Sequence, residues 1–370
     1  MTGSAGARPT IETIAARAGV SIASVSRVLN GLGGRPDTVR KVTDAAEALG
    51  YVPNAVARSL KARRTQQITF AMADIGNPVY VAMVRAIQRE AKAAGYRVLL
   101  HSTDADIDEE LAALRGLAHR HSDGMILCPL RITPALVAEL EAAAGPVVVI
   151  GGAPGDTVPV DHVRADSVAG SAMAVRHLAE QGCRRIGFVN GVVDTVPGRS
   201  RADGYRRGLR AAGLPVDPDL TEVGEFQIED GARATERLLA RAPDLDGLFC
   251  ANDLIALGTL RTLRAAGRSV PGDVAVCGMD DTELAEAAWP PLTSVDLGSS
   301  ERGRLAARLL LDRLGPASAS GAPAPGSASG APVPASAAGT SGSAVAVREL
   351  VEPRLCVRAS SVRTGAGEGR

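Results

Sequence analysis

Aromatic side chains are scarce in this 370-residue chain: four Phe, four Tyr and one Trp make up 2% of the residues. Apolar residues nevertheless reach 45%, so a hydrophobic core has to be built mainly from Ala, Leu and Val. The length exceeds that of one ordinary domain, and we expect two or three domains.

Long apolar runs are also missing. No stretch reaches the roughly 18–20 residues of a membrane helix, and the first ten residues, MTGSAGARPT, contain no apolar segment of the signal-peptide type. These absences predict a cytoplasmic protein with no membrane partner.

Motifs for metal, cofactor or catalytic chemistry are absent as well. The five cysteines show no CxxC spacing, which predicts small buried apolar residues: Cys128, Cys183, Cys250, Cys277 and Cys356. The five histidines form no ligand cluster, and GxSxG, GxxxxGK[ST], HExxH and a dinucleotide fingerprint do not occur. We therefore expect no catalytic residue, no metal and no cofactor, while an enzyme acting on a bound sugar stays as an alternative.

Charge is balanced overall but unevenly distributed along the chain. Residues 1–65 contain ten Lys and Arg against four acids, a formal charge of +6. The other 305 residues hold 31 basic and 37 acidic side chains, a charge of −6. A small basic segment on an acidic body indicates that the segment meets a polyanion.

Three short helices are predicted before residue 51. Apolar residues recur at helical spacing over 11–18, with Thr10 as N-cap and Gly19 as the left-handed C-terminal residue. Ser21 can cap a second helix that ends at Asn30, and a third starts near Pro36 and stops at Gly50. Two helices joined by a tight turn and braced by a third form a helix-turn-helix arrangement.

The second of these helices has two different faces. Val25, Val28 and Leu29 lie on one side at 100° per residue, and small or polar residues lie on the other: Ala23, Ser26, Arg27 and Asn30, with Ser21 and Ile22 at the leading end. Such a face can enter a DNA groove, where an arginine suits a guanine edge or a phosphate. An ordinary amphipathic surface helix would show the same pattern.

From residue 69 onward, short apolar segments alternate with Ala- and Leu-rich helices. This alternation predicts parallel sheets covered on both faces, and its length predicts two α/β subdomains. Strands are expected at 68–75, 97–103, 124–130, 147–152, 185–191, 221–226, 247–253 and 274–280, and helices at 79–94, 107–120, 167–182, 229–241 and 254–266. Ligands bind beyond the carboxyl ends of such strands, in loops that begin here at Asp74, Thr103, Asn190, Phe226, Asn252 and Asp280.

Two segments differ from this pattern. NAVARSLK, within residues 51–64, would make about two helical turns, too few to be stable alone. Residues 316–343 are uncharged and almost entirely Ala, Pro, Gly and Ser, which predicts a disordered surface insertion. A strand pattern resumes in VRELVEPRLCVRAS.

Several motifs in fixed order give the chain a resemblance to the lactose-repressor-like (LacI/GalR) bacterial transcription regulators, from about residue 9 to 360. They are IETIAARAGVSIASVSRVLNG, LGYVPNAVARSL, DIGNPVY, HLAEQGCRRIGFVNG, SRADGYRRGL, ANDLIALGTLRTLR, VPGDVAVCGMDD and PPLTSVDL. The resemblance implies an α/β protein with a helix-turn-helix head, a hinge helix and two subdomains of the periplasmic-binding-protein type. The expected ranges are 9–52 for the head, 53–66 for the hinge, 67–165 with 295–315 for the N-terminal subdomain, and 166–294 with 344–360 for the C-terminal subdomain.

For DNA, the resemblance implies that the recognition helix presents Ser21, Ile22, Ala23, Ser26, Arg27 and Asn30. Ile22 and Ala23 match the pair that sets operator preference, and as apolar side chains they would sense thymine methyl groups and groove shape. Arg27 is the candidate for a bidentate contact with guanine. In the hinge, Asn54, Ala57 and Leu60 match DNA-contacting positions, with Leu60 as the wedge that opens a base step in the minor groove.

For the effector, the resemblance implies Asp253 and Arg199 as the acid and base that hold the ligand. Further cleft residues are Asn77, Tyr80, Asp166, Phe226, Asp280 and Trp289, the last able to stack on a sugar ring. Two positions depart from the family pattern. Arg35 replaces a capping Ser before the third helix, and NPVY replaces a pair of aromatics at the cleft wall.

The resulting prediction is a repressor of a carbohydrate or other metabolic operon, working as a homodimer or higher oligomer on a palindromic double-stranded operator. A small sugar-like effector between the subdomains would control it by changing how the two hinges pair. An alternative from another class is a free-standing periplasmic receptor, which shares the two-lobed body but not the basic head.

Overall fold

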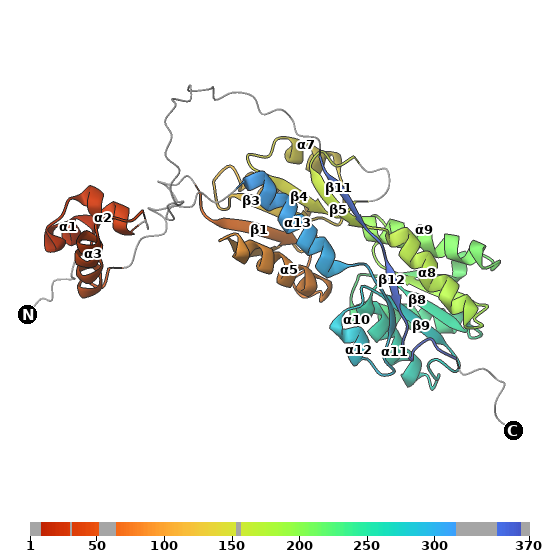
Figure 1. The fold of residues 1–370 in the computed structure, drawn as a ribbon. Coiled ribbons are helices and arrows are strands. Elements are labelled where there is room, and N and C mark those ends of the chain that lie inside the picture. The colour runs from red at the N-terminus through yellow and green to blue at the C-terminus, as the bar shows by residue number, and fades with distance from the viewer. Residues whose placement is uncertain (1–8, 30–31, 52–63, 153–156, 316–345, 364–370) are drawn as a thin grey trace, which may run out of the picture. The chain divides into compact units, whose positions relative to one another are not determined.

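The computed structural model describes residues 9–29, 32–51, 64–152, 157–315 and 346–363 (Figure 1). The chain divides into two units, residues 1–66 with 316–344 and residues 67–315 with 345–370. Residues 53–63 of the predicted hinge (53–66) and the insertion at 316–343 lie outside the described residues, as does Asn30.

The first unit contains the three predicted helices, α1 (Ile11–Ala18), α2 (Ile22–Leu29) and α3 (Pro36–Ala48). They enclose a small core in which Ile14, Val25 and Val42 are fully buried. This core confirms the apolar faces predicted for the helices. No aromatic residue is fully buried in it, so the unit depends on close packing of short side chains.

Local capping explains where these helices begin and end. Thr10 and Thr13 form a reciprocal capping box, and Gly19 adopts the left-handed conformation with φ of 65°. The Ser21 hydroxyl accepts a hydrogen bond from the Ser24 amide at 3.2 Å, as expected for an N-cap. Arg35 precedes α3 without any side-chain cap, which leaves Pro36 to start that helix.

The second unit is built on two six-stranded sheets, as the predicted doubling of an α/β subdomain requires. The first sheet has the order β11-β5-β4-β3-β1-β2, from β1 (Gln67–Met72), β2 (Arg97–Ser102), β3 (Gly124–Cys128), β4 (Val147–Ile150), β5 (Asp161–Ala165) and β11 (Arg348–Val351). The second has the order β12-β10-β9-β8-β6-β7, from β6 (Ile186–Asn190), β7 (Thr221–Val223), β8 (Gly247–Cys250), β9 (Ala275–Met279), β10 (Thr293–Asp296) and β12 (Arg354–Cys356). All described pairings are parallel except β10 with β12.

Helices cover both faces of each sheet, and each sheet with its helices is called a lobe below (Figure 1). The first lobe has α5 (Val79–Ala93), α6 (Ile107–Arg115), α7 (Pro134–Glu141) and α13 (Ser299–Leu314), and the second has α8 (Ser167–Glu180), α9 (Val196–Ala211), α10 (Ile228–Arg241), α11 (Asp253–Ala265) and α12 (Glu283–Ala287), with a short 3-10 turn at Pro218–Leu220. Glycines allow the closest helix contacts. A Cβ on Gly303 of α13 would lie 2.7 Å from the Met83 carbonyl oxygen of α5.

Two strands were not predicted, β5 and β10, because both are polar. Asp161 of β5 is buried since Arg313 donates two hydrogen bonds of 2.7 Å to its carboxylate. Thr293 and Ser294 of β10 are buried because Ser360, Ser361 and Asp253 provide hydroxyl and carboxylate partners. A strand whose buried side chains are polar and hydrogen-bonded shows no apolar alternation, so sequence periodicity does not predict it.

The expected domain ranges differ from the sheets at two places. Residues 344–360 were assigned to the C-terminal subdomain, but Arg348–Val351 pair in parallel with β5 and so extend the first sheet. Residues 295–315 were assigned to the N-terminal subdomain, but Val295 and Asp296 still belong to β10 in the second sheet. The chain crosses between the lobes after β5, after β10 and after β11.

The core of the second lobe concentrates the few aromatics. Phe188 stacks on Phe249 with ring centroids 5.1 Å apart and on Tyr205 at 4.8 Å. Cys183, Cys250 and Cys277 are buried in the same cluster, as predicted, whereas Cys128 and Cys356 are half-buried. Within the described ranges, no helix has the length and apolarity to cross a bilayer, and no group of His, Cys, Asp and Glu could hold a metal ion.

Candidate functional site

The exposed surface of α2 is the first candidate site. Ser21, Ile22, Ala23 and Arg27 are exposed, and the Ile22 side chain keeps 52% of its accessible surface. Ser26 is half-buried, and Val25 is the fully buried residue of this helix. An exposed isoleucine beside an arginine on a capped helix is the surface expected of a helix that enters a DNA groove.

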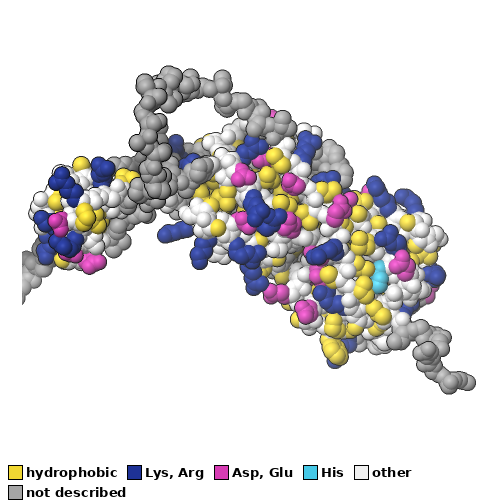
Figure 2. Space-filling model, viewed as in Figure 1, with side chains coloured by type: hydrophobic (Ala, Val, Ile, Leu, Met, Phe, Trp, Pro, Cys, Tyr) yellow, Lys and Arg dark blue, Asp and Glu magenta, His cyan; other side chains and the backbone are white. Residues whose placement is uncertain are grey.

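Further basic side chains are exposed elsewhere in the first unit. Arg17, Arg35 and Lys41 are exposed, and Figure 2 shows Lys and Arg side chains across the visible face of the unit. Arg40 is paired with Asp37 at 2.9 Å on α3. The described part of the first unit therefore exposes basic side chains that can meet phosphates.

A cavity of about 370 Å³ in the second unit is the second candidate site. Residues of both lobes line it, mostly at the carboxyl ends of the strands, as the sequence predicted: Ala73, Asp74, Asn77, Tyr80, Asp104, Cys128, Phe226, Gln227, Asn252, Asp280, Arg201 and Arg302 among others. Its volume suits a small ligand.

A buried ion pair forms part of the cavity wall in the second lobe. The Arg201 guanidinium lies 3.1 Å from the Asp280 carboxylate, and their side chains keep only 8% and 5% of their accessible surface. The Phe226 ring lies 5.7 Å from the Arg201 guanidinium carbon, within the range of a cation–π interaction. A carboxylate and a guanidinium fixed in this way can hold adjacent hydroxyl groups of a ligand.

Local backbone geometry holds Asp280 and Phe226 in place. Asp280 follows β9 with φ of 100°, a conformation rare for a residue with a side chain, and its amide donates to the Val295 carbonyl at 2.8 Å. Strain of this kind is typical of binding sites. Phe226 packs against Gly191, where any Cβ would collide with the ring.

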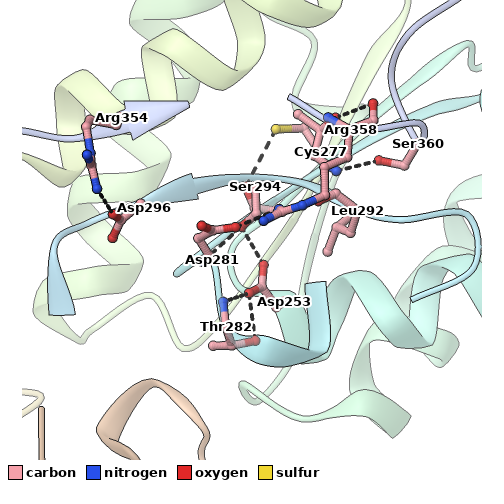
Figure 3. A network of polar contacts seen from close by, with 12 residues as sticks. Asp253, Cys277, Asp281, Thr282, Leu292, Ser294, Asp296, Arg354, Arg358 and Ser360 are labelled. Atoms are coloured by element: carbon pink, nitrogen blue, oxygen red, sulfur yellow. Dashed lines mark hydrogen bonds and ion pairs between the residues drawn. The ribbon is translucent and has the colours of Figure 1, made fainter. Parts of the chain in front are cut away.

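Asp253 is buried and is not among the residues that line the cavity. Figure 3 shows its carboxylate in contact with Thr282 and Ser294. Its carboxylate accepts hydrogen bonds from the Thr282 amide at 2.7 Å, the Thr282 hydroxyl at 2.9 Å and the Ser294 hydroxyl at 2.6 Å. Burial, and secondly the charge of Asp280, raise the pKa of Asp253 to about 7. Asp253 therefore holds the Asp280 loop against α11 and β10.

The first lobe contributes a less polar wall. Tyr80 and Cys128 line the cavity, and burial raises the pKa of the Cys128 thiol to about 11 and that of Tyr80 well above its usual value. Arg302 of α13 also lines the cavity and keeps 9% of its surface. Asn77 lies at the rim, where its side-chain oxygen accepts from the Val79 amide at 3.1 Å.

Contacts between the lobes surround the cavity. Gln227 donates to the Asp74 carboxylate at 3.0 Å, and the Val196 amide donates to the Leu130 carbonyl at 2.7 Å. Arg131 binds both carboxylate oxygens of Asp194 at 3.0 Å. These contacts join the two lobes, so a change in the angle between the lobes would alter them.

Four of the residues that the resemblance implies for the effector site line the cavity: Asn77, Tyr80, Phe226 and Asp280. Three other expected residues lie elsewhere. Arg199 bonds the Asp194 carbonyl and lines a separate surface hollow together with Asp166, which caps α8. Trp289 is 83% exposed, so it does not stack on anything in the cavity.

The acid and base that the structure places together in the cavity wall are therefore Asp280 and Arg201, whereas Asp253 and Arg199, the pair expected from the resemblance, do not line the cavity. Helical spacing explains why Arg199 does not face this cavity while Arg201 does, because residues two apart on a helix point in nearly opposite directions. Arg201, Gly204, Tyr205 and Gly208 form the buried stripe of α9, and Arg199 falls outside that stripe. On α13, Arg302 likewise belongs to the buried stripe, together with Ala306 and Leu310.

Comparisons with known proteins agree with this architecture. The pattern described as "Bacterial regulatory proteins, lacI family" matches residues 10–54, and the "Periplasmic binding protein-like domain" matches residues 175–330. The regulator CelR of Thermobifida fusca is 40% identical over 317 residues, which cover 83% of this chain and 92% of that protein. This chain belongs to the lacI family of bacterial regulatory proteins.

Other members of the family are similar over the same extent. The repressor PurR of Aliivibrio salmonicida is 32% identical, covering 82% of this chain and 92% of that protein, and the ribose operon repressor of Escherichia coli K12 is 33% identical, covering 82% and 93%. The solved structure of a CelR–cellobiose complex shares 36% identity with a TM-score of 0.68 and covers 95% of this chain and 100% of that chain.

The fold is also that of the lac repressor. Its dimer bound to operator and the anti-inducer ONPF superimposes with a TM-score of 0.81 at 23% identity, covering 96% of this chain and 100% of that chain. The helix-turn-helix head and the two parallel-sheet lobes of the family are thus present in one chain.

Proposed function

We propose that this chain is a repressor of a carbohydrate or related metabolic operon, that two copies bind a palindromic operator, and that a small molecule in the cavity changes operator affinity. The observation that carries this proposal is one chain with two binding surfaces: an exposed, capped helix α2 and a cavity lined by residues of both lobes, with the Arg201–Asp280 pair in its wall. Operator DNA and cellobiose are the ligands in the structures of two relatives.

On DNA, Arg27 makes the hydrogen bonds that read a base, and Ile22 and Ala23 contact thymine methyl groups. Ser21 and Ser26 lie close to the DNA backbone. The Ser21 hydroxyl is already used as the helix cap, so it reads no base. Asn30 and the hinge residues Asn54, Ala57 and Leu60, outside the described residues, complete the expected contacts, with Leu60 entering the minor groove.

The DNA assignment is tested on a palindrome selected from genomic fragments, by gel shift. Arg27→Ala should weaken specific binding about 5- to 150-fold, the effect of losing one bidentate base contact. Arg27→Lys keeps the charge but loses the forked geometry, so it should restore non-specific binding and not the preference for the operator. Unchanged specific binding in both Arg27→Ala and Leu60→Ala would remove the DNA assignment.

In the cavity, Asp280 and Arg201 hold the hydroxyl groups of a sugar-like effector, and Asn77, Tyr80 and Phe226 contact its other faces. Thermal-shift screening of the whole chain against sugars and sugar derivatives identifies the ligand class, because a ligand that binds the native state raises the melting temperature. The Arg199→Ala variant is the matched control for Arg201→Ala, since both remove an arginine from α9 and only Arg201 lines the cavity. Equal responses of the two variants would exclude this cavity as the effector site.

The dimer is proposed through the edge of the first lobe. The edge strand β2 exposes Leu99 and Leu100, and the adjacent α5 exposes Val81, each with 40% or more of its surface free. Leu100→Asp should convert the dimer to a monomer in analytical ultracentrifugation and weaken operator binding, since one head contacts only half of a palindrome. A dimer unaffected by this change would assign the interface to another surface.

We assign no catalytic step and no cofactor to the chain, and we place it in the cytoplasm with its DNA. The family members named above are regulators, which supports this choice. Turnover of a bound sugar that is lost on Asp280→Asn would favour the enzyme alternative instead.

A further inference from the structure

The innermost wall of the cavity contains more positive than negative charge. Arg201 and Arg302 both line it and are more than nine-tenths buried, but Asp280 is the one buried carboxylate among the lining residues that the structure describes. Asp280 is already 3.1 Å from Arg201. A second buried guanidinium therefore has no carboxylate of its own.

The other acids of the lining cannot supply that partner. Asp104 and Glu225 are exposed at the mouth, and Asp74 is half-buried there with hydrogen bonds from the Gly76 amide and from Gln227. Asp253, which is buried and does not line the cavity, accepts three hydrogen bonds from Thr282 and Ser294. None of these carboxylates lies within ion-pair distance of Arg302.

Arg302 is held in place by packing and not by pairing. It lies on the apolar stripe of α13, next to Gly303, where that helix presses on α5. Its side chain donates one hydrogen bond, 3.0 Å to the Ser299 hydroxyl, and its buried Nε has no acceptor within the described residues. Burial lowers the pKa of Arg302 from its usual value, while electrostatic interactions with Cys128 and, secondly, with Asp280 oppose this change. A buried cation without a counter-ion is costly for the free protein.

We propose that the effector of this chain carries an anionic oxygen group, a carboxylate or a phosphate, which Arg302 binds on the first-lobe side of the cavity. This inference rests on the proposed function, in which the cavity is the effector site, and adds the chemical class of the ligand. Arg201 and Asp280 hold hydroxyl groups, and the anion completes the charge balance with Arg302. The ligand class is thus a hydroxylated acid or a phosphorylated sugar rather than a neutral sugar.

The test uses the full chain and four probes at matched ionic strength: glucose, gluconate, glucose 6-phosphate and inorganic phosphate. Melting temperature and calorimetric titration are measured on the wild type and on Arg302→Met, which keeps the side-chain length without the charge. Arg302→Lys is the conservative variant. Arg304→Met is the matched control, because Arg304 lies on the same helix but pairs with Glu301 at the surface.

We expect at least one anionic probe to bind the wild type more tightly than glucose, and its affinity to fall about 10- to 100-fold in Arg302→Met, the effect of losing a charge-assisted hydrogen bond. Arg302→Lys should retain part of the affinity, and Arg304→Met all of it. Gluconate and glucose 6-phosphate distinguish a carboxylate from a phosphate, and binding of either supports the proposal.

Equal responses of the wild type and Arg302→Met to every anion, including no response at all, would overturn the proposal. If glucose alone stabilises both proteins, the proposed function stands and the anionic class falls. Failure of the proposed function has a separate signature, operator binding that no substitution on α2 weakens, and it is measured without any of these probes.

Discussion

The two binding surfaces of this chain are constructed in opposite ways. The recognition helix α2 presents exposed side chains, Ile22, Ala23 and Arg27, on a helix whose fully buried residue is Val25. The wall of the cavity between the lobes instead contains a buried ion pair, Arg201 with Asp280, whose side chains are part of the folded interior. The side chains that α2 exposes contribute little to the folded interior, whereas the paired side chains of the cavity wall are buried in it.

This difference has a consequence for mutation. Exposed side chains away from caps and cores contribute little to stability, so substitutions on α2 should change DNA binding alone. Buried pairs are coupled, so substitutions in the cavity should change stability and binding together. Three predictions, from the largest expected effect to the smallest, separate the two surfaces.

The largest effect is expected from Asp280→Ala. This change leaves the Arg201 charge buried without a partner, which costs about 3–5 kcal/mol in the free energy of unfolding, measured by urea denaturation. The double variant Arg201→Met with Asp280→Leu removes both charges and should recover most of the loss. Arg27→Ala should stay within about 0.5 kcal/mol of the wild type. A similar loss of unfolding free energy in Arg27→Ala and Asp280→Ala would mean that the two surfaces do not differ in their contribution to stability.

The second effect is a pH dependence that originates at Asp253. Burial first, and the charge of Asp280 second, raise the pKa of Asp253 to about 7 in the folded protein, above its usual 3.8. Between these values the folded chain binds more protons than the unfolded chain, so the free energy of unfolding falls as the pH rises. The contribution is complete below about pH 4 and is lost as the pH passes about 7.

This dependence is measured by urea denaturation at pH 5 and pH 8. The wild type should lose more stability between the two pH values than Asp253→Asn, which cannot titrate. Burial also raises the pKa of Glu110 to about 7, but Glu110 is present in both proteins and cancels in the comparison. The same pH dependence in both proteins would mean that Asp253 is ionised throughout this range.

The smallest effect is expected at the contact between the lobes near the cavity mouth. Gln227→Ala removes the hydrogen bond to Asp74, and because both side chains are partly exposed the ligand affinity should fall only about two- to three-fold in calorimetry. Glu236→Ala, on the same α10 helix but away from the lining, is the control. A loss as large as that from Arg201→Ala would make lobe closure, rather than the buried pair, the main source of affinity.

Much of the fold follows from the sequence because apolar periodicity and caps are strong signals. The bounds of α1 and the capping role of Ser21 agree with their prediction. Eight strands also lie where they were predicted, although each ends one to three residues before its predicted bound. The polar strands β5 and β10 could not be found in this way, because the partners that bury them, such as Arg313 and Ser360, are distant in the chain. Tertiary hydrogen bonds of this kind leave no local pattern.

The site was predicted less well than the fold, for a geometric reason. Loops at the carboxyl ends of strands identify the region, and Tyr80, Phe226 and Asp280 are found there. Which arginine faces the cavity depends on helix phase, and Arg201 rather than Arg199 lies on the buried stripe of α9. Arg302 belongs to no sequence motif. The role proposed for it rests on the lack of a carboxylate partner, which can be seen only in the three-dimensional structure.

The most direct test of the account measures the coupling between the two surfaces. Operator affinity is measured by fluorescence anisotropy with and without a saturating amount of the probe that gives the largest thermal shift. Coupling of about 1–3 kcal/mol would change the operator dissociation constant about 5- to 150-fold, and operator would change the affinity for the probe by the same factor. Arg201→Ala should abolish this response while Arg199→Ala preserves it. An operator affinity that is identical with and without bound probe would contradict the account.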